Sequence, residues 1–265
     1  MIRFIDTGEN SGAMNMAIDE ALLIAQAKYG SPPVVRVYRF APPTLSIGVF
    51  QSAIKEVNFE KIRELGFGFV RRPTGGRAVL HDKELTYSIT IAYPHRILDL
   101  NLLQSFHLLS TGIIKAIQKL GGNPNFSQKE SKISTPSCFA APTFSDILIN
   151  GKKVVGSAQM RNKYGLLQHG SIVYDVKIEH IFDCFNLSEH LREKFIKIGY
   201  ESISSLSKEI GRSINFYDIK DALKEGMEEI FGEKLVESAL SIIEWEIAYE
   251  LFKNKYNTIE WNMKK

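Results

Sequence analysis

The sequence predicts an α+β fold in which a mixed, largely antiparallel sheet is flanked by helices. Strand patterns in the first two thirds of the chain are joined by hairpin signals and interrupted by helices, without repeated βαβ units. From about residue 178 the pattern is almost entirely helical. No Pro/Gly/Ser-rich stretch is long enough to be a linker, so we expect residues 1–265 to form a single domain with a helical C-terminal portion.

Hydrophobic periodicity and proline positions predict the elements of the first 50 residues. After an opening strand, residues 14–29 place apolar side chains at helical spacing among good helix formers, which predicts a helix. Residues 34–40 and 44–50 are β-rich and predict two strands. Residues 41–43, Ala-Pro-Pro, separate them because proline interrupts either period.

The next elements surround a glycine pair. Asn58 is the expected N-cap of a short helix that Gly66 stops. Strands are then expected over residues 67–72 and 77–80, on either side of the sequence Pro-Thr-Gly-Gly at 73–76.

The middle of the chain has the clearest periodic patterns. Residues 85–93 alternate between large apolar and small side chains, which predicts a strand with one buried face. Residues 102–120 are amphipathic at helical spacing. Gly121 and Gly122 follow, and glycine tolerates the left-handed conformation that ends helices.

Two hairpins and a helical region complete the chain. Asn150-Gly151 suits a type I′ turn and predicts a hairpin between residues 144–149 and 152–161. A second hairpin is expected to lead into residues 166–175. In the last third, we expect helices around residues 188–198, 216–230 and 236–256.

Composition excludes several classes of protein. Lys+Arg of 33 against Asp+Glu of 30 gives a net charge of +3, which offers no concentrated basic face for nucleic acid. No apolar run approaches the roughly 20 residues of a membrane span, and the N-terminus lacks a signal-peptide pattern. Two cysteines cannot build a disulfide framework, and no spacing suggests a metal site. We therefore expect a cytoplasmic protein without a bound metal.

The first candidate site is the segment 71–82, Arg-Arg-Pro-Thr-Gly-Gly-Arg-Ala-Val-Leu-His-Asp. Gly75 and Gly76 let the backbone approach a ligand closely, and Arg71 and Arg72 can meet a phosphate or carbonyl oxygen. The segment is neither a P-loop nor a dinucleotide-binding fingerprint. The alternative interpretation is a hairpin turn with incidental surface arginines.

The second candidate site is the predicted strand 152–161. Gly156, Ser157 and Ala158 are small where packing normally requires larger side chains, so we expect something else to lie against them. By alternation, Lys153 shares one face of this strand with residues 155, 157 and Gln159. The alternative is that Lys152 and Lys153 are two exposed lysines after a turn.

Cysteine and histidine supply the remaining candidates. Cys138 lies in a loop with two prolines, where a reactive thiol is more plausible than a buried inert one. Cys184 lies in an apolar run and is expected to be packing. His169 on a predicted strand can line a pocket or serve the structure, and the pair His81-Asp82 has the same two interpretations.

These segments together resemble the biotin/lipoate protein ligase superfamily, in its lipoate–protein ligase and octanoyltransferase branch. The resemblance rests on residues 14–22, segment 71–81, Gly-Lys-Lys-Val-Val-Gly-Ser-Ala-Gln at 151–159, Leu-Gln-His-Gly-Ser at 167–171, and the ending 256–262. It implies a class II ligase-like fold that encloses an acyl tunnel. It also implies that Lys153, not Lys152, is the active-site lysine.

Within this branch, Cys138-Phe139 resembles the cysteine loop of LipM-type octanoyltransferases, and its separation from Lys153 is similar to theirs. The resemblance implies that Cys138 and Lys153 are catalytic. The expected substrate-binding residues are Arg71, Arg72, Gly75, Gly76, Ala78, His81, Gly156, Ser157, Ala158, Gln159 and His169. No cofactor is implied. The implied partners are octanoyl-acyl carrier protein as donor and a lipoyl-domain protein as acceptor, either the glycine cleavage H protein or dehydrogenase E2 subunits.

Three alternatives remain open from the sequence. One is an ATP- and Mg-dependent lipoate–protein ligase, in which Arg71 and the Gly-Gly turn hold phosphates. Another is an amidotransferase that moves octanoyl between lipoyl domains. The third, from a different class, is a non-catalytic acyl-binding protein.

Overall fold

The computed structural model describes residues 1–128, 137 and 146–264. Its strands are β1 (Ile2–Asn10), β2 (Val34–Phe40), β3 (Thr44–Ile47), β4 (Gly68–Arg71), β5 (Val79–His81), β6 (Glu84–Ala92), β7 (Asn125–Phe126), β8 (Ile147–Ile149), β9 (Lys152–Arg161), β10 (Gly165–Val173) and β11 (Leu235–Glu237). Its helices are α1 (Gly12–Tyr29), α2 (Ala53–Glu56), α3 (Phe59–Glu64), α4 (Leu102–Lys119), α5 (Ile178–Asp183), α6 (Glu189–Ser202), α7 (Leu206–Ile210), α8 (Phe216–Phe231), α9 (Ile242–Leu251) and α10 (Ile259–Asn262), with a 3₁₀ turn η1 (Arg96–Leu98) and a π-helical segment η2 (Phe252–Tyr256).

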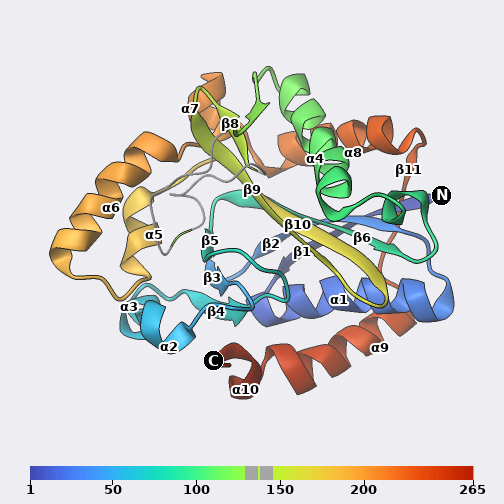
Figure 1. The fold of residues 1–265 in the computed structure, drawn as a ribbon, viewed down its shortest axis with the longest axis horizontal. Coiled ribbons are helices and arrows are strands. Elements are labelled where there is room, and N and C mark those ends of the chain that lie inside the picture. The colour runs from blue at the N-terminus through green and yellow to red at the C-terminus, as the bar shows by residue number, and fades with distance from the viewer. Residues whose placement is uncertain (129–136, 138–145, 265) are drawn as a thin grey trace.

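The predicted α+β class is confirmed. Across the described residues, eight strands form one mixed sheet in the order β11-β1-β2-β6-β10-β9-β8-β7, and three strands form a second sheet in the order β4-β3-β5. In the large sheet β1 is parallel to both β11 and β2, whereas the ladders from β2 through to β7 are antiparallel. Figure 1 shows α4 and α8 above this sheet and α1 and α9 below it.

Helix α4 confirms the prediction for residues 102–120. Asn101 caps it through a reciprocal capping box with Gln104, and Gly121 follows it with a φ of 92°. Its apolar side packs with α8 against the sheet, where Leu109, Ile113 and their neighbours form the largest apolar core. Helices α4 and α8 therefore cover one face of the large sheet with apolar side chains.

Strand β6 departs from the expectation of one buried face, because both of its faces are buried. The apolar side chains face the core under α4, and the small polar side chains face α1. There Ser88 donates a 2.6 Å hydrogen bond to Asp19, and Gln26 donates a 2.7 Å hydrogen bond to Thr90. The alternation was correct, but the polar face is matched by polar groups of a helix rather than by water.

The Asn150-Gly151 hairpin is confirmed, with φ of 52° and 79° at these two residues as a type I′ turn requires. The continuous helix expected over 236–256 is wrong at its start. Residues 235–237 form β11, which extends the large sheet beside β1, and the helix begins only at Ile242 after the Ser241 N-cap. The C-terminal third therefore contributes an edge strand as well as helices.

The segment between β4 and β5 is not a hairpin turn. Both strands pair with β3, β4 in parallel and β5 antiparallel, so residues 72–78 cross from one side of β3 to the other. The interpretation of Arg71 and Arg72 as surface arginines is wrong, since both side chains are buried. The crossing brings the glycine pair and Arg72 over the end of the small sheet.

Arg71 is also not a substrate-binding residue, which corrects the prediction from sequence. Its guanidinium donates to backbone carbonyls of Gly48, Val49 and Gln51 on one side. On the other side it donates to the carbonyls of residues 261, 262 and 264. Because all of its N–H groups face carbonyl oxygens, Arg71 fastens the C-terminal turn to the small sheet.

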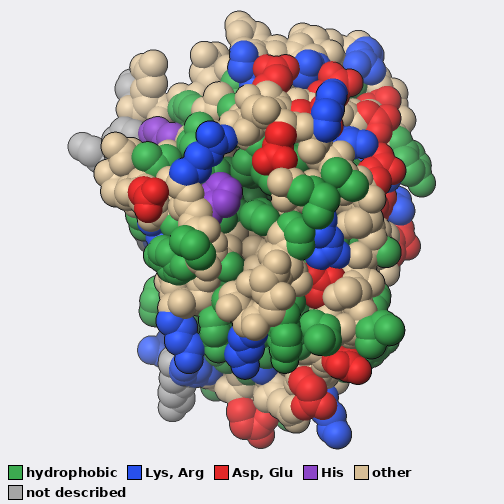
Figure 2. Space-filling view, turned by 90° about the vertical axis from the view of Figure 1, so that its right-hand side faces the viewer, with side chains coloured by type: hydrophobic (Ala, Val, Ile, Leu, Met, Phe, Trp, Pro, Cys, Tyr) green, Lys and Arg blue, Asp and Glu red, His purple; other side chains and the backbone are tan. Residues whose placement is uncertain are grey.

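The surface carries no dominant feature on the face that Figure 2 draws, where Lys and Arg are interspersed with Asp and Glu. In the described part of the chain, no helix combines the length and the apolar character that crossing a bilayer requires.

Replacing Arg71 tests the fastening role. Arg71→Met leaves several buried carbonyls without a donor, each costing roughly 1–3 kcal/mol, so the free energy of unfolding should fall by at least about 3 kcal/mol in urea titrations. The exposed Arg63→Ala is the matched control and should change it by less than about 0.5 kcal/mol. Arg71→Met with the stability of the control would contradict this assignment.

Candidate active site

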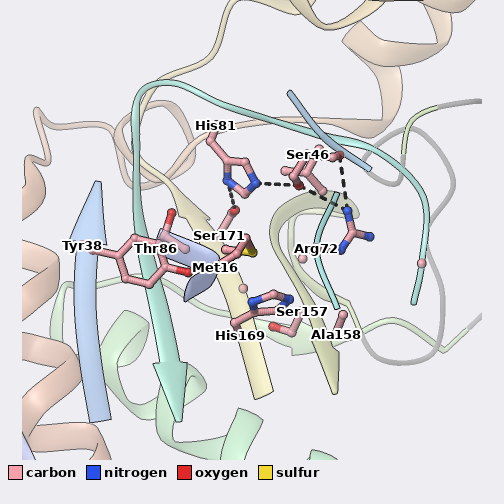
Figure 3. A pocket seen from close by; sticks show the side chains of 14 residues that line it. Met16, Tyr38, Ser46, Arg72, His81, Thr86, Ser157, Ala158, His169 and Ser171 are labelled. Carbon is pink, nitrogen blue, oxygen red and sulfur yellow. Dashed lines mark hydrogen bonds between the residues drawn. The ribbon is translucent and has the colours of Figure 1, made fainter. Parts of the chain in front are cut away.

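A single pocket gathers most of the predicted site residues. It has about 450 Å³ of empty space, part of it open to solvent, and lies between the two sheets beside α1 (Figure 3). Its lining residues come from six strands, α1 and the 72–78 crossing: Met16, Tyr38, Ser46, Arg72, Gly76, Val79, His81, Thr86, Gly156, Ser157, Ala158, His169, Gly170 and Ser171.

The small residues of β9 form one wall of this pocket. Gly156 is paired with Ser171, and Ala158 with His169, across the antiparallel β9–β10 ladder. Directly opposed residues of such a ladder share a face, so these four face the pocket together. The expected gap against Gly156 and Ala158 is therefore present, and it is an open pocket.

Besides Arg71, three predicted substrate-binding residues lie away from the lining. Gly75 accepts a 2.8 Å hydrogen bond from Arg72 through its carbonyl. Ala78 is buried and bridges Ser137. Gln159 donates to Gln168 and accepts from Ser105 of α4, so its amide serves the opposite face of the sheet.

Lys153 is fully buried and forms a 2.8 Å ion pair with Asp146. The alternative of two exposed lysines is therefore wrong for Lys153. Lys152 does lie at the surface, where it donates to the carbonyl of Tyr200. A buried ammonium is stable only with close partners, so Lys153 depends on Asp146.

The face that Lys153 occupies differs from the prediction. Leu148 pairs with Lys153 and Ile147 with Val155, so β9 holds one extra residue at this point. Because Ile147 and Leu148 face opposite sides of β8, Lys153 and Val155 also face opposite sides. The bulge therefore moves Lys153 onto the face that Gly156 and Ala158 present to the pocket.

Cys138 lies outside the described residues. Ser137, the residue before it, is buried and bridges Ala78 at the start of β5. Cys184 behaves as predicted, since it is buried in an apolar cluster and burial raises the pKa of its thiol to about 12.

Arg72 reaches the pocket with a constrained guanidinium. Its Nη2 donates to the carbonyls of Gly75 and Arg77 at 2.8 and 2.7 Å, which holds the crossing segment. Its Nη1 lies 3.2 Å from Ser46 Oγ. The Gly-Gly turn packs directly against the backbone at Gly48. A side chain at position 48 would collide with it, because a Cβ there would lie 2.0 Å from the carbonyl oxygen of Gly76. Gly48 was not identified from the sequence, where a lone glycine after a strand carries little signal.

His81 pairs with Glu84 rather than with its sequence neighbour Asp82. His81 Nδ1 lies 2.5 Å from Glu84 Oε1, and His81 Nε2 lies 2.8 Å from Ser46 Oγ (Figure 3 shows the serine contact). Ser46, Thr86 and Ser171 were missed because small polar residues in buried strands resemble the ordinary polar face of a strand.

His169 meets both interpretations, since it lines the pocket and is held on both sides. Its Nε2 lies 2.6 Å from Thr74 Oγ1, and its Nδ1 lies 3.5 Å from Asp19 Oδ2. Burial lowers the pKa of His169, and the contact with Asp19 offsets this only in part. Burial alone raises the pKa of Asp19, but Arg36, His169 and Ser88 lower it overall.

The pocket can therefore hold an apolar chain next to groups suited to acyl chemistry. Met16, Tyr38 and Val79 supply apolar surface, while Arg72, His81 and Ser46 supply polar groups on one wall. No cluster of three potential metal ligands occurs among residues 1–128, 137 and 146–264.

Solved structures with this architecture define the class. A bi-partite lipoate protein ligase from Thermoplasma acidophilum superposes with a TM-score of 0.84 at 25% identity, covering 98% of this chain and 95% of that one. A lipoate-protein ligase A bound with ATP gives a TM-score of 0.80 at 24% identity, covering 98% of each chain. The fold is thus that of these lipoate ligase structures.

Sequence comparison identifies the family. Residues 11–228 match the family described as the lipoyl protein ligase A/B catalytic domain, and this chain belongs to that family. It is 39% identical to the "Octanoyltransferase LipM" of Kyrpidia tusciae, covering 99% of this chain and 98% of that protein. It is also 39% identical to the "Octanoyltransferase LipM" of Bacillus subtilis at the same coverage. The predicted resemblance is confirmed.

The buried His169 makes stability depend on pH. Because the folded protein lowers its pKa below the ordinary 6.5, protons favour the unfolded chain. The free energy of unfolding should therefore fall as the pH drops below about 6.5, by up to about 1.4 kcal/mol per pH unit from this residue. His169→Gln should remove this slope in urea titrations between pH 7 and 5, and the exposed His190→Gln should retain it. Equal slopes in both variants would exclude His169 as the source.

Proposed function

We propose that this protein transfers an octanoyl group to the lysine of a lipoyl domain through an S-octanoyl intermediate on Cys138. The full-length similarity to octanoyltransferases supports octanoyl transfer in lipoate biosynthesis. The single observation that carries the two-step mechanism is the bulge in β9. It places the buried Lys153 on the same face of the strand as Gly156 and Ala158, which line the pocket.

The pocket suits an eight-carbon chain. Its apolar part is lined by Met16, Tyr38, Val79 and the side-chain-poor stretch of β9. Burial of an acyl chain contributes about 0.8 kcal/mol of binding free energy per CH₂. An octanoyl group buries several more CH₂ groups than a short acyl group, so the pocket should bind it much more tightly. Octanoyl-acyl carrier protein is the proposed donor.

The first half-reaction needs a thiolate. A free thiol has a pKa of about 8.5 and is mostly protonated at neutral pH, whereas a nearby ammonium favours the thiolate. Lys153 is the proposed ammonium, and Asp146 holds it in place. Ser137 supports this assignment, because its bridge to Ala78 brings the chain that leads to Cys138 to the pocket segment 76–81.

In this mechanism the Cys138 sulfur attacks the thioester carbonyl, and the carrier-protein thiol leaves. The amine of the acceptor lysine then attacks the new thioester, forms the amide and releases Cys138. Backbone N–H groups of Gly75-Gly76 or Gly156-Ser157 are the proposed oxyanion donors, each worth roughly 3–4 kcal/mol in other enzymes. The steps use no nucleotide and no metal ion, and the glycine cleavage H protein is the proposed acceptor.

The ligase alternative loses one of its supports. It required Arg71 to hold ATP phosphates, and the Arg71 guanidinium instead faces backbone carbonyls. Arg72 is the arginine that reaches the pocket. A transfer between lipoyl domains uses the same thioester chemistry and differs only in the donor.

Mass spectrometry after mixing with octanoyl-acyl carrier protein tests the intermediate. The wild-type protein should gain one octanoyl group, and Cys138→Ala should lose both this adduct and transfer to the H protein, because no other thiol is activated. Cys184→Ala is the matched control for a buried thiol and should retain both. Full transfer by Cys138→Ala would refute the acyl-enzyme mechanism.

The Lys153–Asp146 pair gives a second test of the first half-reaction. Asp146→Asn leaves a buried charge without its partner and should lower the free energy of unfolding by about 3–5 kcal/mol. The double variant Lys153→Met/Asp146→Asn removes both charges and should recover most of that loss.

Octanoylation of the folded double variant should be sharply slowed at neutral pH and should recover in part toward pH 8.5, because more thiol then ionises without help. Stopped-flow acylation across pH measures this. A folded double variant that acylates at the wild-type rate at pH 7 would show that Lys153 does not activate the thiol.

A further inference from the structure

Ser46, His81 and Glu84 form a continuous hydrogen-bonded chain at the polar wall of the pocket. Ser46 Oγ lies 2.8 Å from His81 Nε2, and His81 Nδ1 lies 2.5 Å from Glu84 Oε1. All three residues are buried, and Ser46 and His81 line the pocket. A hydroxyl, an imidazole and a carboxylate at these distances are the parts of a proton-transfer chain.

The hydrogen bonds around Glu84 assign the direction of this chain. Glu84 Oε1 also accepts from Thr86 at 2.6 Å and from Ser171 at 2.9 Å, so this oxygen is the acceptor of the cluster. His81 Nδ1 therefore carries the proton that Glu84 accepts, and His81 Nε2 is free to accept the Ser46 hydroxyl proton. His81 is thus a base whose accepting nitrogen is directed at Ser46.

Ser46 keeps one acceptor position for a substrate. A hydroxyl oxygen has two lone pairs, and Arg72 Nη1 occupies one of them at 3.2 Å. The guanidinium also favours negative charge developing on this oxygen. The imidazole ring is held by stacking on Phe40, with ring centroids 4.1 Å apart and planes 16° from parallel.

The chain of groups lies near Ser137, the residue that precedes the proposed nucleophile. Ser46 pairs with Val79 in the β3–β5 ladder, and Ala78 bridges Ser137 on the other side of β5. Two strand spacings of about 4.8 Å therefore separate Ser46 from Ser137. Ser137, the residue before the proposed nucleophile, therefore lies close to the strands that carry Ser46 and His81.

The second half-reaction requires a proton acceptor that the first does not. A lysine side chain with a pKa near 10.4 reaches the enzyme mostly as an ammonium, and it must lose two protons to become an amide N–H. Lys153, already an ammonium paired with Asp146, is not the group to accept them. His81 lines the pocket and has an assigned accepting nitrogen, so it is the base that we assign to this role.

We propose that Ser46 and His81 relay a proton from the attacking lysine amine, with Glu84 as the positioning residue; the proposal rests on the function proposed above. The neutral amine, after losing its first proton to solvent, attacks the thioester carbonyl and the C–N bond forms. An amine proton passes to Ser46 Oγ as the Ser46 proton passes to His81 Nε2. The C–S bond then breaks and sulfur leaves as the thiolate, beside the ammonium of Lys153.

Single-turnover measurements separate the two half-reactions. In His81→Gln and Ser46→Ala, the S-octanoyl enzyme should form at the wild-type rate from octanoyl-acyl carrier protein. Its transfer to the lysine of the H protein should slow by about 10²–10⁴-fold, the usual contribution of a positioned base. The adduct should therefore accumulate, which mass spectrometry detects.

Hydroxylamine provides the control for pocket integrity, because it is uncharged at neutral pH and attacks thioesters without a base. It should deacylate both variants at the wild-type rate. The exposed His190→Gln is the matched histidine control and should behave as wild type with both acceptors. Thermal melting identifies a variant that fails to fold, in which case the other variant decides.

Three outcomes would overturn the relay. Wild-type transfer rates in both variants would show that neither group moves the proton. Equal slowing of both half-reactions, or equal slowing with hydroxylamine, would assign these residues to the shape of the pocket. If the wild-type protein forms no octanoyl adduct, the proposed function itself fails and the relay fails with it, an outcome distinct from an adduct that forms and transfers normally in the variants.

Discussion

The burial of one carboxylate, Asp19, is the constraint on which the rest of the structure depends. Its oxygens accept from Arg36 and Tyr38 of β2 and from Ser88 of β6, and they face His169 of β10. One side chain of α1 thus ties the helix to three strands of the large sheet. Since a buried charge is costly unless its partners are all in place, these contacts specify a single position of α1 beneath the pocket.

The same principle governs the other charges around the pocket. Arg71 is satisfied by carbonyls, Arg72 by the turn that it holds, and Lys153 by Asp146. The partners of each charged side chain therefore decide whether it serves the structure or the pocket. The Arg71 guanidinium donates to backbone carbonyls and has a structural role, whereas Arg72 lines the pocket.

Local patterns predicted the fold class, the two hairpins and the main helices because each depends on short-range periodicity or turn chemistry. They could not predict that β4 and β5 both pair with β3, that residues 235–237 join the sheet edge, or that a bulge changes the face of Lys153. Each of these is set by pairing between distant segments. In the site, the small residues of β9 correctly predicted a gap beside the strand. Ser46 and Glu84 could not be identified from the sequence, because only their contacts with His81 set them apart from other buried polar residues.

The central claim is that the acyl group reaches this pocket as a thioester and not as an adenylate. The most direct measurement offers the protein octanoyl-acyl carrier protein in one reaction, and free lipoate with ATP and Mg²⁺ in another, with the H protein as acceptor in both. The account predicts acylated H protein from the carrier-protein donor without ATP, and no pyrophosphate in the second reaction. Transfer that requires ATP and releases pyrophosphate would contradict it.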